Sequence, residues 1–247
     1  MSSISRRAML KSACGIGALL ALPAAELFAQ TEPRFVPLRL NGRGQAQLNG
    51  RVSALDTHED QLLDDLLGSN VNGERRDLGI IDDDINQLIA NPGNPININP
   101  SDFRREGLRI HDQIGIVLGA GLGRQSIFGV VQMIDSFVGH WYPCNDIVEI
   151  GTCEQRIWNS FGGGGNLQVV EFYSVHMRYE MESIFRFHGR GGAFGRQTSG
   201  LIGVLDRVTG LARRGDFGAC QAEYMRLTMA TDLVFRKYYP DWCGGPA

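Results

Sequence analysis

Apolar residues recur at helical spacing through most of the chain from Ser101 to Tyr239. Residues three or four positions apart share one face of a helix, so this pattern predicts amphipathic helices. Segments that alternate apolar and polar residues, as half-buried strands do, are few. We therefore predict an all-α protein: a helical bundle of about four long helices, preceded by an extended arm and two short helices.

The expected elements follow from the same pattern and from turn and capping residues. Residues 31–54 are polar and contain two Asn-Gly pairs, which favour turns, so we expect an extended arm or a weak hairpin there. We expect short helices over 55–67 and from Asp82-Asp83-Asp84 onward, where carboxylates favour a helix start. Asn91 to Pro100 should be a break. Helical spacing runs from 101 to 122 and resumes over 127–141, before a cysteine-bearing loop. Further long helices are expected over 166–187, 199–214 and 217–239.

The first 29 residues have the features of an export signal. A basic start is followed by the apolar run from Ala13 to Leu22 and by small residues before position 30. The pair Arg6-Arg7 resembles the twin-arginine type of signal, whose receptor exports proteins that are already folded. We therefore expect three parts: a signal peptide (1–29), an arm with short helices (30–100) and a bundle domain (101–247). The mature protein should be periplasmic or secreted.

The charge balance and hydropathy exclude two classes of partner. The chain carries 24 basic and 27 acidic side chains, and removal of the basic signal makes it more acidic. A nucleic-acid-binding module would instead show a clustered basic face. After the signal, no apolar stretch reaches the roughly 18 residues that a membrane span needs. We expect neither nucleic-acid binding nor a transmembrane segment in the mature chain.

Four cysteines remain after the signal: Cys144, Cys153, Cys220 and Cys243. An even number in an oxidising compartment is typical of disulfides. Sequence alone permits three pairings, of which we favour Cys144–Cys153 and Cys220–Cys243. The spacing matches no compact zinc or iron–sulfur pattern, so we predict no metal site.

The glycines at 119, 121 and 123 resemble the start of a dinucleotide-binding turn. However, Arg124 stands where that fingerprint requires its third glycine, and the alternating strand–helix pattern around it is missing. The glycines at 115, 119 and 123 lie four residues apart instead. We interpret the run as a place of close helix contact or as a helical break.

Two further groups of residues are candidates for a site. His176 and Glu180 lie four apart, adjacent on one helix face, and could relay a proton as catalytic residues. Glu-x-x-His motifs on two helices, as in di-iron bundles, are absent. The Gly-rich run that contains Arg190, Gly191, Gly192 and Arg196 precedes a helix start, where free backbone N–H groups favour anions.

The sequence thus leaves two hypotheses about function. The first is a non-catalytic accessory subunit or binding protein outside the cytoplasm, which would partner a catalytic subunit such as a periplasmic oxidoreductase. The second is an enzyme that acts on a small anionic substrate at the Gly/Arg-rich loop. No cofactor can be assigned from the sequence.

Overall fold

The computed structural model describes residues 40, 42–162, 165–188 and 193–238, and every regular element among them is a helix. The predicted all-α class is therefore confirmed for these residues. The predicted signal peptide lies outside them. The elements are α4 (Gly42–Ala46), α5 (Gly50–Leu67), α6 (Val71–Ala90), α7 (Pro100–Ala120), α8 (Arg124–Trp141), α9 (Pro143–Gly162), α10 (Leu167–His188), α11 (Ala193–Arg213) and α12 (Phe217–Tyr238).

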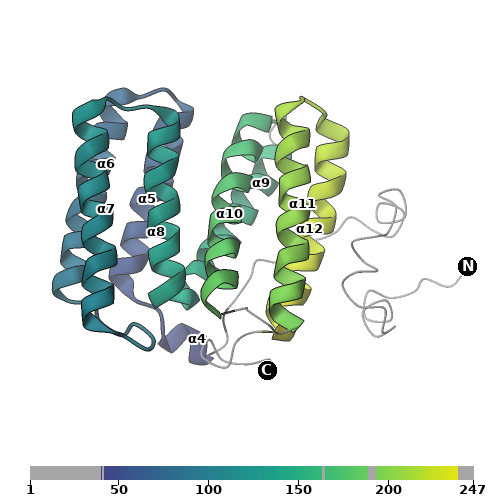
Figure 1. The fold of residues 1–247 in the computed structure, drawn as a ribbon. Helices are drawn as coiled ribbons and strands as arrows, with labels where there is room; N and C mark the ends of the chain where they lie inside the picture. The colour runs from purple at the N-terminus through teal and green to yellow at the C-terminus, as the bar shows by residue number, and fades with distance from the viewer. Residues whose placement is uncertain (1–39, 41, 163–164, 189–192, 239–247) are drawn as a thin grey trace, which may run out of the picture.

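The long helices form two groups that meet along their inner faces (Figure 1). Helices α5 to α8 make one group, in which α6 packs against both α5 and α7. Helices α9 to α12 make the other, in which α10 packs against α9 and α11. Contacts of α10 with α8 and of α9 with α8 join the two groups. The centre of the molecule is therefore enclosed by α5, α8, α9 and α10.

The predicted number of long helices was too small, because the described residues form eight helices of 18–22 residues. Helix α5 begins at Gly50, where the side chain of Asn49 caps it by accepting from the Arg51 N–H. Helix α6 is likewise a long helix, capped by Asn70. Most of the part of the expected arm that the structure describes, 42–46 and 50–54, is therefore helical.

The acidic run Asp82-Asp83-Asp84 lies in the middle of α6, not at a helix start as we predicted. Two of these carboxylates accept hydrogen bonds from neighbouring helices instead of capping their own. Asp84 contacts His58 Nδ1 of α5 and Asp82 contacts His111 Nδ1 of α7, each at 2.6 Å. These contacts tie α6 to its two neighbours.

Helix α9 is the largest departure from prediction, because it occupies the segment where we expected a loop. Pro143 at its first position is preorganised for a helix start, since the missing N–H would be unpaired there anyway. Its buried face mixes Ile147 and Ile150 with acidic residues and Cys153. That mixture conceals the apolar period by which helices are recognised in a sequence.

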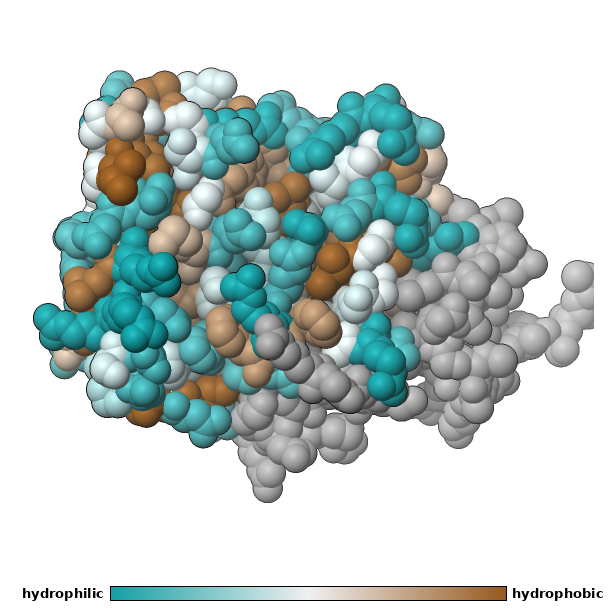
Figure 2. All heavy atoms as spheres, in the orientation of Figure 1, coloured by the Kyte–Doolittle hydropathy of each residue, from teal (hydrophilic) through white to brown (hydrophobic). Residues whose placement is uncertain are grey.

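A single apolar core runs from Leu40 to Phe235 and includes side chains of every long helix. At the surface, hydrophobic residues are interspersed among hydrophilic ones on the face shown in Figure 2. None of the described helices combines the length and apolarity that a membrane span requires. The glycine run at 119–123 ends α7, because Gly121 has φ 103°, a conformation that L side chains rarely adopt. Gly115 and Gly119 face open space, so the break is confirmed and close helix contact is not.

Gly139 sets the distance between α8 and α10. A Cβ at this position would clash with the Ser183 side chain and would lie 2.7 Å from the Asp146 Oδ2 atom. We expect Gly139→Ala to reduce the free energy of unfolding by about 1–3 kcal/mol, as overpacking does. Gly129→Ala is the matched control, since nothing lies within 4 Å of that position on the same helix. There the better helix propensity of alanine should raise stability by up to ~1 kcal/mol. Denaturant titration measures both, and equal effects would contradict the close approach.

Candidate metal centre

Helices α5, α8, α9 and α10 enclose an acidic cluster at the centre of the protein. Each of its members is at most 8% exposed and lies close enough to others for their charges to interact. We call these seven side chains the acidic core: Asp56, Glu59 and Asp60 on α5, Asp135 on α8, Asp146 and Glu149 on α9, and Glu180 on α10. So many carboxyl groups in one protein interior require compensation.

Helical spacing accounts for how the chain brings these groups together. Residues three or four positions apart lie on one face of a helix. On α5 this places Asp56, Glu59 and Asp60 on the inner face. On α10 it aligns His176 with Glu180, whose closest atoms, Nε2 and Oε1, are 3.6 Å apart.

His176 is the only basic group that the described residues place inside the acidic core. It is fully buried, and its Nε2 atom lies 3.2 Å from Asp135 Oδ1 and 3.9 Å from Glu59 Oε1. Burial by itself lowers the pKa of His176, but the carboxylates of Asp135, Glu149 and Asp60 outweigh it and raise this pKa to about 9. The imidazole is thus surrounded by negative potential.

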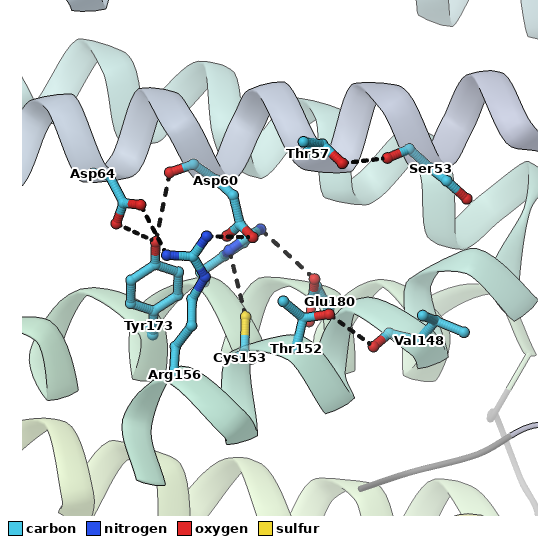
Figure 3. A network of polar contacts seen from close by, with 11 residues as sticks. Ser53, Thr57, Asp60, Asp64, Val148, Thr152, Cys153, Arg156, Tyr173 and Glu180 are labelled. Atoms are coloured by element: carbon cyan, nitrogen blue, oxygen red, sulfur yellow. Dashed lines mark hydrogen bonds and ion pairs between the residues drawn. The ribbon is translucent and has the colours of Figure 1, made fainter. Parts of the chain in front are cut away.

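Arg156 of α9 supplies a second positive charge, at the edge of the core (Figure 3). Its guanidinium contacts Asp60 at 3.0 Å and Asp64 at 2.8 Å. It also lies 4.8 Å from the centre of the Tyr173 ring, whose hydroxyl donates to Asp64. This group connects α9 and α10 to α5. Of the acidic core it contacts only Asp60, whereas His176 is the positive partner of Glu59, Asp135 and Glu180.

Burial dominates the protonation behaviour of the acidic core. Desolvation raises the pKa of Glu59, Asp146, Glu149 and Glu180 well above the ordinary range, and neighbouring carboxylates raise it further. Hydrogen bonding does not offset this cost, because many carboxylate oxygens find no partner among the described residues. The unpartnered oxygens of the core are Glu59 Oε1, Asp60 Oδ1, Asp135 Oδ2, Asp146 Oδ2, Glu149 Oε1 and both oxygens of Glu180.

Two sets of side chains in this region offer the geometry of a metal site. Glu149, Cys153, His176 and Glu180 each present one ligand atom, and these atoms all lie within 4.8 Å of one another. Glu59 and Asp135 form a second such set with the same histidine. Carboxylate, imidazole and thiolate groups are the usual protein ligands of divalent transition metals. Our expectation of no metal site stays a prediction, and these two sets are the places at which it can be tested.

His176 and Glu180 had been predicted as a pair, and the structure brings them together. The other acidic residues come from α5, α8 and α9, and no local pattern links them to this pair. The predicted anion site remains a prediction, because Arg190, Gly191 and Gly192 lie outside the described residues. Arg196 lies in the first turns of α11 and is exposed.

Both disulfide pairings that we favoured are wrong, because Cys153 and Cys220 are free thiols. Cys144 and Cys153 lie on the same helix, nine residues or about 13 Å apart along its axis, which is too far for a bridge. The Cys220 thiol is buried and donates to the Val208 carbonyl oxygen at 3.5 Å. Cys243 lies outside the described residues.

Comparisons of the chain with protein-family models, with curated proteins and with solved structures found no match. The function is therefore inferred from the residues of the acidic core.

Proposed function

We propose that this protein is an exported metal-binding protein that holds a divalent cation in its acidic core. Glu180 carries the proposal: it is 1% exposed, and neither of its carboxylate oxygens has a hydrogen-bond partner among the described residues. The imidazole of His176, 3.6 Å from Oε1, is an ion-pair partner beyond hydrogen-bonding distance, so a carboxylate in that position must stay protonated or gain a further cation. Its neighbours within ligand distance are Glu149, Cys153 and His176.

The number of acidic groups favours a cation over protonation alone. A buried polar group without a partner costs about 1–3 kcal/mol, and the acidic core contains several. A bound cation removes this cost at several positions together, because it attracts every carboxylate around it. Metal-binding free energy then contributes to folding, as it does in other proteins whose sites form only in the folded chain.

Export through the twin-arginine route is consistent with this proposal. That route carries folded proteins, so a cation bound in the cytoplasm would already be enclosed before the protein crosses the membrane. Location outside the cytoplasm and a role as a binding protein remain parts of the proposal, and they rest on the signal-like residues 1–29.

The test compares the mature protein with two single variants. The native protein should contain a divalent metal by elemental analysis. Glu180→Gln should weaken metal affinity by at least roughly 10–100-fold, the loss that follows even from removing an outer-shell partner. Glu154→Gln is the matched control, because Glu154 is equally buried and also lacks hydrogen-bond partners for both carboxylate oxygens among the described residues, but it belongs to neither set of potential metal ligands there. We expect its metal affinity to equal that of the parent.

Two results would contradict the proposal. One is a parent protein that neither contains a divalent metal nor binds one after chelation and dialysis. The other is an equal loss of affinity in Glu154→Gln and Glu180→Gln, which would indicate a general effect of altering a buried carboxyl group.

A further inference from the structure

Cys153 adds a sulfur donor to the acidic core. The thiol is free and fully buried on α9, near Glu180 of α10 (Figure 3). Its Sγ atom lies 3.5 Å from Nδ1 of His176. The sulfur and an imidazole nitrogen are thus adjacent. Glu149 and Glu180 each offer a carboxylate oxygen within 4.8 Å of a ligand atom of both residues.

The distance between Cys153 Sγ and His176 Nδ1 matches the distance expected between two ligand atoms on one tetrahedral metal ion. Bonds of about 2.3 Å to sulfur and about 2.0–2.1 Å to nitrogen, at a tetrahedral angle, place the two donors roughly 3.5–3.6 Å apart. The observed distance of 3.5 Å between Cys153 Sγ and His176 Nδ1 matches this spacing.

The other nitrogen of His176 is already engaged. Nε2 lies 3.2 Å from Asp135 Oδ1, so an N–H at this position donates to the carboxylate. When a metal displaces the Nδ1 proton, the remaining proton stays on Nε2, and the Nδ1 lone pair becomes available on the side of Cys153. Carboxylates commonly orient metal-binding histidines in this way and fix the tautomer that binds. Asp135 is thus placed as a positioning residue for the histidine.

We propose, on the basis of the metal-binding function above, that the cation is a thiophilic transition metal of the zinc or cobalt class. It is bound tetrahedrally by Cys153 Sγ, His176 Nδ1 and the carboxylates of Glu149 and Glu180, and Asp135 orients the histidine. Calcium and magnesium take all-oxygen sites, so a buried thiolate in the ligand set disfavours them. Burial, reinforced by the nearby carboxylates, raises the pKa of the Cys153 thiol, so binding must displace a proton from it.

Cobalt(II) is the probe, because a cobalt–thiolate bond gives a charge-transfer absorption in the near ultraviolet. The metal-stripped mature protein should bind Co²⁺ with this absorption and with the intense visible bands of tetrahedral coordination. Zinc should displace the cobalt, whereas an excess of Ca²⁺ or Mg²⁺ should not. This competition uses the unmodified protein and does not depend on any variant that fails to fold.

Three variants test which residues produce the cobalt absorption and the cobalt affinity. Cys153→Ser should lose the charge-transfer absorption, and Cys220→Ser, which removes the other buried free thiol of the described residues, should keep it. Asp135→Asn should keep the absorption but bind cobalt roughly 10–100-fold more weakly. Unchanged affinity in Asp135→Asn would overturn its positioning role.

The outcomes separate this inference from the function on which it rests. If the parent binds Co²⁺ without charge-transfer absorption, or Cys153→Ser keeps that absorption, the thiolate ligand is wrong and metal binding stands. If the parent binds neither Co²⁺ nor Zn²⁺, both the inference and the proposed function fail.

Discussion

Replacing His176 by alanine is expected to abolish metal binding and to destabilise the metal-stripped protein strongly. His176 is fully buried and contacts Glu59, Asp135 and Glu180. Removing one partner of a buried charged group costs about 3–5 kcal/mol, because the remaining charges lose their compensation in a medium of low polarity. In a chain of this size we expect the unfolding temperature to fall by roughly 10 °C.

The control for this change is His111→Ala. His111 also contacts a carboxylate, Asp82, at 2.6 Å, but its side chain is 44% exposed. Exposed ion pairs are worth about 0–1 kcal/mol because water solvates both partners. Calorimetry and denaturant titration of the stripped proteins measure the difference. Similar losses in the two variants would show that the acidic core does not depend on its histidine.

The second large effect is a reversal of the pH dependence of stability when metal is removed. In the stripped protein, burial holds the pKa of acidic groups such as Glu59, Asp146 and Glu180 well above their values in the unfolded chain. Interaction with carboxylates, against the opposing effect of burial, raises the pKa of His176 from 6.5 to about 9. The folded state therefore holds more protons than the unfolded state from about pH 4 upward.

Because the folded state binds the extra protons, stability must fall as pH rises through this window. Each extra proton contributes a slope of about 1.4 kcal/mol per pH unit. The stabilisation that comes from the raised pKa of His176 is fully present below pH 6.5 and is lost as pH rises through about 9. We therefore expect the stripped protein to be more stable at pH 5 than at pH 8.

The metal-loaded protein should show the opposite trend over the same range. Its ligands must be deprotonated, so metal affinity grows with pH, and tighter binding to the folded state raises stability. Unfolding temperatures measured from pH 5 to pH 8, with saturating zinc and with chelator, provide the comparison. Parallel profiles under the two conditions would count against a metal in the acidic core.

Local pattern was sufficient to predict the class of the fold and several of its helices. The apolar period through Leu167, Val170, Met177, Met181 and Ile184 predicted the helix that the structure shows as α10. The adjacency of His176 and Glu180 followed from their spacing of four, because a helix fixes that geometry without help from the rest of the chain. Such features depend only on residues near one another in sequence.

Helices α6 and α9 show where this reasoning fails. In α6 the carboxylates of Asp82 and Asp84 were interpreted as a helix start, but they contact histidines of two neighbouring helices. In α9 the acidic side chains of Asp146 and Glu149 are buried, although such groups are almost never buried without a partner. A pattern rule treats them as exposed and therefore misses the helix.

The sequence by itself determined that the chain is helical and that His176 and Glu180 share a helix face. Only the tertiary structure decided that Cys153 meets this pair and that acidic residues of α5 and α8 complete the core. The physical reason is that a metal site depends on distances between helices, such as the 3.5 Å between Cys153 Sγ and His176 Nδ1. Helical periodicity determines which residues share a face of one helix. Which residues of other helices lie opposite that face depends on how α5, α8, α9 and α10 pack together.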